Sequence, residues 1–135
     1  MRYLLDTNIC IYLIKKRPPE VLQKFNAYSV GEIGISSITV AELQFGVQKS
    51  RYLEQNQRAL EQFLIPLTIA DFDYQAAIAY GAIRATLEAQ GTPIGSLDTL
   101  IAAHASSLNV TLVTNNTREF SRVPGLEIVN WVDEE

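Results

Sequence analysis

Acidic and amide side chains follow short apolar runs at several points of this chain, a pattern typical of a site built where strands end. Asp6 comes directly after Tyr3–Leu5, and the apolar run resumes at Ile9. Burying an unpaired carboxylate costs several kcal/mol, so such a group is normally hydrogen-bonded, ion-paired or bound to a metal. A capping role is the alternative, because Asp6 or Asn8 can accept backbone N–H bonds where a helix begins.

Three further positions show the same pattern. Glu42 lies in a helix among apolar neighbours, although Thr39 before it also predicts a capping box, in which Glu42 reaches back to the helix start. Asp98 falls in the first turn of a helix, where the helix dipole keeps a carboxylate ionised. Asn116 follows the apolar run 112–113, and a simple turn is the alternative there. Chemistry at these positions therefore depends on whether they converge.

A convergent site of this composition would consist of oxygen ligands, which suit Mg²⁺ or Mn²⁺ and not Zn²⁺. The natural chemistry of such a centre is metal-assisted attack of water on a phosphodiester. The chain contains no Gly-rich phosphate-binding loop and no Gly-x-Ser-x-Gly motif that would offer a competing centre. His104, the only histidine, is expected to be a packed or capping residue and not a base.

Short apolar segments that alternate with helical patterns must position these side chains. We expect strands at 3–5, 33–36, 67–69, 111–113 and 127–129, and helices at 9–16, 20–28, 38–49, 54–64, 73–90 and 96–108, the last capped by Ser96. The alternation predicts a three-layer α/β/α sandwich with a short, mostly parallel central sheet of about five strands. Ligands of such sheets bind beyond the carboxyl ends of the strands.

The composition is that of an ordinary globular protein, with 47% hydrophobic and 19% charged residues among 135, so we expect one domain over residues 1–135. A single cysteine, Cys10, excludes an internal disulfide and favours the reducing cytoplasm. Neither a signal peptide nor a membrane-spanning run is expected. The net charge of −4 includes three acids at 133–135, and it neither supports nor excludes a nucleic-acid substrate.

Four motifs in order along nearly the whole chain resemble those of a PIN domain and, more narrowly, of a VapC-type toxin from a bacterial toxin–antitoxin pair. These motifs are Leu4-Leu5-Asp6-Thr7-Asn8, Ile35-Ser36-Ser37-Ile38-Thr39-Val40-Ala41-Glu42-Leu43, Pro93-Ile94-Gly95-Ser96-Leu97-Asp98-Thr99-Leu100-Ile101-Ala102 and Leu112-Val113-Thr114-Asn115-Asn116-Thr117-Arg118-Glu119-Phe120. Their order makes the resemblance far more specific than any one of them.

The resemblance implies a Mg²⁺- or Mn²⁺-dependent endoribonuclease whose metal ligands are Asp6, Glu42 and Asp98. Asn116 stands where the family usually has a fourth acid, so we expect one tightly held metal and a second that is weak or arrives with the substrate. The groups implied to orient the carboxylates and the metal's water molecules are Thr7, Asn8, Ser37 and Thr114. The roles of Arg118 and Glu119 are left open.

The resemblance also implies partners: a VapB-type antitoxin, a homodimer, a larger toxin–antitoxin complex and a structured RNA substrate. The RNA expected is a tRNA, and most narrowly the anticodon region of initiator tRNA. The helix at 9–16 is apolar nearly all round, so something must cover its outer face. Either the chain's own next two helices cover it, or an antitoxin segment lies in the groove between them.

Three other interpretations compete with this one. A phosphatase of the haloacid dehalogenase type also opens with a strand ending in Asp, but its chemistry needs a second acid two residues later, where this chain has Asn8. A catalytically weak or inactive PIN-like module that binds RNA or protein is favoured by Asn116 and disfavoured by the three acids. A structure-specific DNA nuclease would need helical insertions for which this chain has little room.

Overall fold

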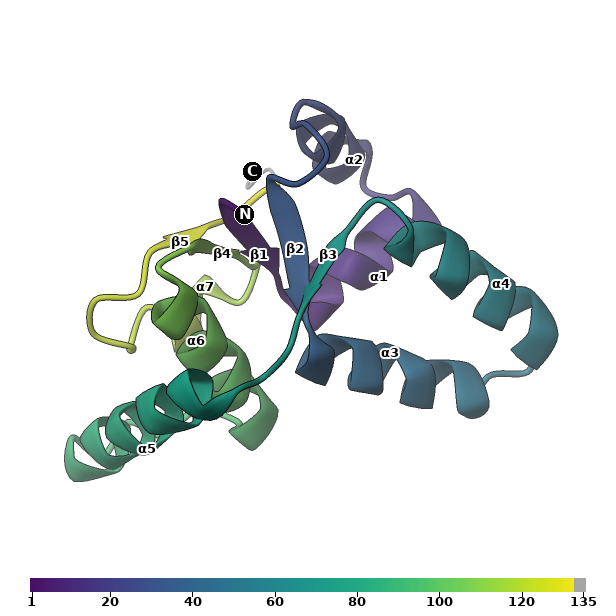
Figure 1. Cartoon of the computed structure of the whole chain (residues 1–135). Helices are drawn as coiled ribbons and strands as arrows, with labels where there is room; N and C mark the ends of the chain where they lie inside the picture. Colours follow the sequence, from purple (N-terminus) through teal and green to yellow (C-terminus); the bar gives the residue numbers. More distant parts are fainter. Residues whose placement is uncertain (133–135) are drawn as a thin grey trace.

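Five short strands form one all-parallel sheet at the centre of the molecule, in the order β3-β2-β1-β4-β5 (Figure 1). The computed structural model describes residues 1–132. The strands are β1 (Tyr3–Leu5), β2 (Ile33–Ser36), β3 (Thr68–Ala70), β4 (Thr111–Val113) and β5 (Ile128–Val129). Three of them, β1, β2 and β4, have the predicted bounds, because fully buried parallel strands read as short continuous apolar runs.

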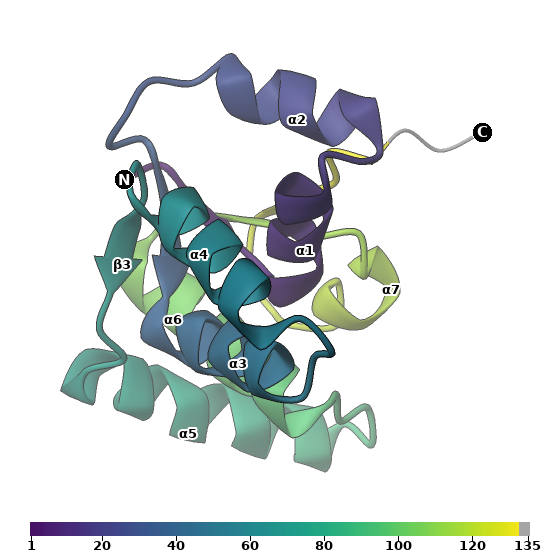
Figure 2. The same ribbon diagram turned by 90° about the vertical axis from the view of Figure 1, so that its right-hand side faces the viewer.

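Helices cover both faces of this sheet, which confirms the predicted three-layer α/β/α sandwich (Figure 2). The helices are α1 (Thr7–Lys15), α2 (Pro19–Asn26), α3 (Ser37–Gln48), α4 (Leu53–Leu64), α5 (Tyr74–Ala89), α6 (Ser96–Leu108) and α7 (Thr117–Phe120). The short α7 was not predicted, because four residues are too few to show a helical repeat of apolar positions.

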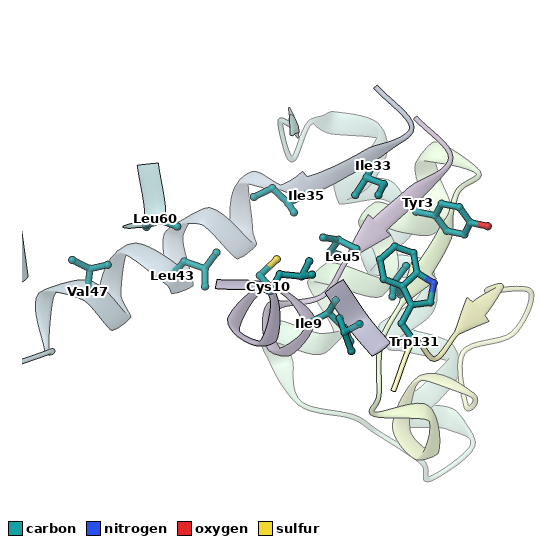
Figure 3. Packing of buried hydrophobic residues seen from close by; sticks show 13 residues of the cluster. Tyr3, Leu5, Ile9, Cys10, Ile33, Ile35, Leu43, Val47, Leu60 and Trp131 are labelled. Atoms are coloured by element: carbon teal, nitrogen blue, oxygen red, sulfur yellow. The ribbon is translucent and has the colours of Figure 1, made fainter. Parts of the chain in front are cut away.

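The first face of the sheet packs against α1, α2, α3 and α4 (Figure 3). Leu5 and Ile35 extend from neighbouring strands toward Ile9 and Cys10 of α1, and Trp131 closes the cluster from the C-terminal side. Alternate residues of a strand point to opposite faces, so Leu4 belongs to the second cluster. That cluster joins Leu112 to buried residues of α5, α6 and α7, namely Leu87, Ile101, Ala102, Ala105 and Phe120.

The centre of the sheet determines where the site lies. β1 pairs with β2 on one side and with β4 on the other, so the strand order reverses beside β1. In β2 the backbone comes close to its neighbours at Gly34, where an added Cβ would lie 2.7 Å from the Thr68 carbonyl oxygen and would clash with Met1. The carboxyl ends of β1 and β4, which lead into Asp6 and Thr114, therefore meet at the switch point that such folds use for ligands.

Two predicted caps are wrong. Ser96 is the first residue of α6 and not its cap, because Gly95 holds the extended backbone before the helix and no side chain caps that end. The Thr39–Glu42 capping box is absent as well, because α3 begins earlier and is capped by Ser36, whose Oγ accepts the N–H of Ile38 at 3.1 Å.

No helix in the described part of the chain is long and apolar enough to cross a membrane. The organisation of residues 1–135 as one domain stays a prediction, and the acidic run at 133–135 lies outside the described residues.

Candidate metal centre

Asp6 lies at the end of β1 and is only 5% exposed. Its carboxylate accepts the N–H of Ile9 at 2.9 Å, which makes it the cap of α1, and it accepts the hydroxyl of Thr114 at 2.5 Å. Burial raises the pKa of Asp6, while the bonds from Thr114 and from the backbone oppose that rise. The capping interpretation is therefore correct, and the second carboxylate oxygen is held by Thr114, which directly follows β4.

Glu42 lies on α3, half-buried and facing the start of α1. The hydroxyl of Thr7 donates to Glu42 Oε1 at 3.3 Å, so the residue after Asp6 orients the second predicted acid. This contact joins the first and third helices at the edge of the sheet.

Asp98 and Glu119 form a hydrogen-bonded pair of carboxyl groups between α6 and α7. Burial raises the pKa of Asp98 to about 7, with the hydrogen bond to Glu119 and the nearby charges of Asp6 and Glu42 adding to the rise. The pKa of Glu119 is lowered because it accepts hydrogen bonds from Asp98 and Asn116. The proton of the pair therefore resides on Asp98.

Glu119 is the acid that the sequence interpretation missed. Asn116 donates its side-chain amide to Glu119 Oε2 at 3.0 Å, and its backbone N–H binds Thr114 Oγ1 at 2.9 Å. Asn116 thus holds a carboxylate one helical turn further along. The signal was present in the i, i+3 spacing of the two residues, which places them on the same face once 117–120 is helical.

Three of the four residues implied to orient the site do lie at it. Thr7 and Thr114 donate to Glu42 and Asp6, and Asn8 lines the same groove. Ser37 does not: its Oγ accepts the backbone N–H of Phe72 at 3.0 Å, so it connects α3 to the segment after β3.

A groove of about 780 Å³ brings the predicted residues together. Its acidic end contains Asp6, Glu42, Asp98 and Asn116. Its remaining walls are formed by α1, α3 and α4, and they include Ile11, Ile14, Lys15, Leu43, Phe45, Gly46, Val47, Lys49, Asn56, Ala59 and Leu60.

The donor chemistry of the acidic end fits a hard divalent cation, because every polar group named there offers oxygen and the carboxylates repel one another. Within residues 1–132, however, no three His, Cys, Asp or Glu side chains are gathered closely enough to hold a metal ion. The acids converge on one groove without forming a closed ligand set.

His104 lies beneath the site on α6, 1% exposed. Its Nδ1 is 2.7 Å from Ser36 Oγ, and its ring meets the edge of Phe72. Burial lowers the pKa of His104, while Asp71 and Asp73 oppose that change. The hydrogen bond to Ser36 connects α6, which carries Asp98, to the start of α3, which carries Glu42. The imidazole of His104 does not line the groove.

The fold and the groove define a known class of protein. The PIN domain family model matches residues 3–126, and the chain belongs to that family. The resemblance inferred from the four motifs is therefore confirmed.

Within the family, the chain is similar to VapC proteins. A ribonuclease VapC2 of Haemophilus influenzae is 51% identical over 132 residues, covering 98% of this chain and 99% of that protein. A tRNA(fMet)-specific endonuclease VapC of Salmonella typhimurium is 45% identical over 131 residues, covering 97% and 98%. The crystal structure of VapBC2 from Rickettsia felis, bound to a DNA fragment from their promoter, matches with a TM-score of 0.92 at 47% identity and covers 98% of this chain and 100% of that chain.

Proposed function

We propose that this protein is the ribonuclease toxin of a VapBC-type pair, an endoribonuclease that cuts tRNA in the cytoplasm. The observation that carries the proposal is the gathering of Asp6, Glu42, Asp98 and Asn116 at one end of a single groove, with Glu119 bound to Asp98. The similarity to VapC ribonucleases over nearly the full length supports the reaction class. The relative named for tRNA(fMet) supports initiator tRNA as the substrate to test first.

We further propose that the reaction depends on Mg²⁺ or Mn²⁺ held by Asp6, Glu42 and Asp98, with Glu119, hydrogen-bonded to Asp98, adding negative charge beside them. A bound cation of this kind would activate water and offset charge on the phosphodiester. Thr114 keeps the Asp6 carboxylate oriented, Thr7 does so for Glu42, and Asn116 does so for Glu119. Asp98 must lose its proton before it can act as an ionised ligand.

One gel tests this proposal. Purified protein, free of any partner, is incubated with transcribed initiator tRNA and with total tRNA, in Mg²⁺, in Mn²⁺ and in EDTA. We expect discrete fragments that require the metal, and sequencing of their ends identifies the cut. An Asp6→Ala variant, compared by circular dichroism to show that it is folded, should give none.

Intact RNA in every lane, from folded wild-type protein, would contradict the nuclease and favour a catalytically weak or inactive binding module. The open ligand set and Asn116 are the observations that favour that alternative. A band shift with labelled tRNA would then distinguish RNA binding from none.

We propose that a VapB-type antitoxin covers the apolar walls of the same groove. On α1, Ile9, Cys10 and Leu13 are buried within the chain, whereas Ile11 and Ile14 face the groove. The VapBC complexes among the similar structures support such a partner.

Ile11→Arg should abolish co-purification with the antitoxin, while Ile65→Arg, at an exposed position outside the groove lining, should not. Equal capture by both variants would place the partner elsewhere.

We also propose a homodimer that assembles through the outer face of α5 and adds to a larger complex with the antitoxin. Tyr74 and Ile78 of α5 are 76% and 51% exposed, and Ile69 on the edge strand is 45% exposed. Sedimentation velocity should give a dimer for the wild-type chain and a monomer for Ile78→Glu. A wild-type monomer at every concentration would contradict this.

The toxin role has its own test. Expression of the chain alone should arrest bacterial growth, and co-expression of the reading frame next to its gene should relieve the arrest. Growth unaffected by a protein that accumulates in soluble form would contradict that role.

A further inference from the structure

An aromatic ring lies exposed on the rim of the groove, next to the acids. Phe45 of α3 is 65% exposed although it lines the groove, whereas its neighbours Leu43 and Val47 are buried. One turn of helix separates it from Glu42, which corresponds to about 4.5 Å along the axis. A large ring left in water so near a candidate catalytic centre is available to contact a ligand there.

Cations accompany the ring. Lys49 lies one turn beyond Phe45, with its Nζ 5.1 Å from the ring centroid, and it also lines the groove. Lys15, at the end of α1, lines the same groove. Moving along α3, the groove therefore presents a carboxylate at Glu42, then an aromatic ring at Phe45, then an ammonium group at Lys49.

The space beside the ring is open. A Cβ built on Gly46 would meet no atom within 4 Å, so this stretch of α3 leaves room along the groove next to Phe45. A flat group that lies on an aromatic ring needs such free space beside it.

We propose that Phe45 is a stacking platform for one unpaired base of the RNA, next to the phosphodiester that is cut, with Lys49 and Lys15 contacting flanking phosphates. This inference rests on the proposed function and specifies its substrate class as RNA in which a loop or single strand can turn a base outward. Bases inside a duplex are stacked and paired, whereas unpaired bases are read by stacking on aromatic side chains.

The antitoxin segment proposed for the apolar walls of the groove can also reach the ring, but the charges beside Phe45 favour a nucleotide at this position. The ring lies between a carboxylate and an ammonium group, with a second lysine across the groove. A nucleotide matches this series, because its base can lie on the ring, its phosphate can meet a lysine and the adjoining phosphodiester can reach the acids. A purely apolar side chain would match the ring alone.

The experiment is a cycle that pairs protein and RNA changes. Wild type, Phe45→Ala and Phe45→Trp are each assayed with a synthetic anticodon stem–loop and with versions abasic at either nucleotide beside the cut. We expect Phe45→Ala to lower kcat/KM on the intact hairpin by roughly 10-fold or more, and Phe45→Trp to retain activity. One abasic substitution should impair the wild type as much as Phe45→Ala does, and it should have little further effect on Phe45→Ala.

Tyr52→Ala is the matched control, since Tyr52 is 61% exposed with Arg51 5.6 Å from its ring centroid, and it lies outside the groove lining. A structural defect would lower kcat/KM by the same factor whether or not the base is present. Equal losses of kcat/KM by Phe45→Ala on the intact and the abasic hairpins would therefore overturn the inference. Full cleavage by Phe45→Ala with loss of antitoxin binding would also overturn it and assign the ring to the protein partner. No cleavage by the wild type would overturn the proposed function and, with it, this inference.

Discussion

The Asp98 carboxyl donates its proton in a hydrogen bond to Glu119, and this pair dominates the electrostatics of the site. A carboxyl whose pKa is raised in the folded state binds its proton more tightly there than in the unfolded chain. Its contribution to stability is therefore fully present at low pH, and it is lost as the pH rises toward the folded pKa of about 7. The acids that would bind a cation thus weaken the fold when they are all ionised.

Replacing Asp98 by Asn should separate stability from activity. At pH 8 in EDTA the neutral amide relieves the repulsion from Glu119, Asp6 and Glu42, so we expect Tm to rise by roughly 3 °C. At pH 5, where Asp98 is protonated in the wild type, the difference should largely disappear. RNA cleavage should be lost at both values. Differential scanning fluorimetry measures the change in Tm, and the tRNA gel measures cleavage. If the variant cleaves RNA normally, Asp98 is not part of the catalytic site.

His104 should give the opposite dependence on pH. Its pKa is lowered by burial, so the unfolded chain binds the proton more readily and the fold loses stability as the pH falls from 6.5 through the folded pKa. The change has this sign even though Asp71 and Asp73 reduce it.

We expect His104→Asn to be less stable than the wild type at pH 7.5, because a buried ring is lost, and to show a smaller loss between pH 7.5 and 5.5. The difference between the two proteins in urea midpoint, followed over this range, isolates His104 from the carboxyl groups. Parallel curves would show that the pKa of His104 is the same in the folded and the unfolded chain, against the lowered folded pKa expected from its burial.

Among the elements, α4 is anchored in the core by few residues. Leu60 is the residue of α4 that is buried, and it both joins the core of the first face and lines the groove. The helix packs against α3 and α1 and forms one wall of the groove. Leu60 is therefore the central anchor of this wall, and Phe63 and Leu64 pack against the same core from partly buried positions.

Leu60→Ala should loosen that wall selectively. Truncation of a buried leucine costs about 2–5 kcal/mol, and here we expect the cost to appear as local opening of α4. Hydrogen exchange followed by mass spectrometry should show faster exchange in 53–64 and unchanged protection in β1 and β4. A uniform loss of protection would show that α4 unfolds only together with the whole molecule.

The helices and strands were largely predictable from the sequence. The side-chain contacts between residues of different elements were not. Apolar runs identified β1, β2 and β4 because such strands are buried on both faces. The role of Glu119 depends on how α6 and α7, joined through β4, place it beside Asp98, and no local pattern encodes that contact. The contact of Ser37 was unpredictable for the same reason, since its partner Phe72 lies 35 residues away.

At the scale of the whole molecule, the net charge of −4 does not attract RNA, so any attraction to phosphates must come from local cations such as the lysines that line the groove. If Lys15 and Lys49 make the phosphate contacts, the logarithm of the binding constant should fall with the logarithm of salt concentration with a slope of about −1.4. Anisotropy of a labelled stem–loop in EDTA measures it. Lys49→Gln should reduce the slope by about half, and an unchanged slope would exclude that contact.

The bond between Thr114 and Asp6 joins residues 108 positions apart, and β1 takes its place between β2 and β4, which are made later. A ribosome that synthesises this chain therefore releases the first acid early and the groups that orient it near the end. A protein proposed to attack the translation apparatus is, by its strand order, incomplete while that apparatus is still making it. The same delay would give the proposed antitoxin time to be present before the groove is complete.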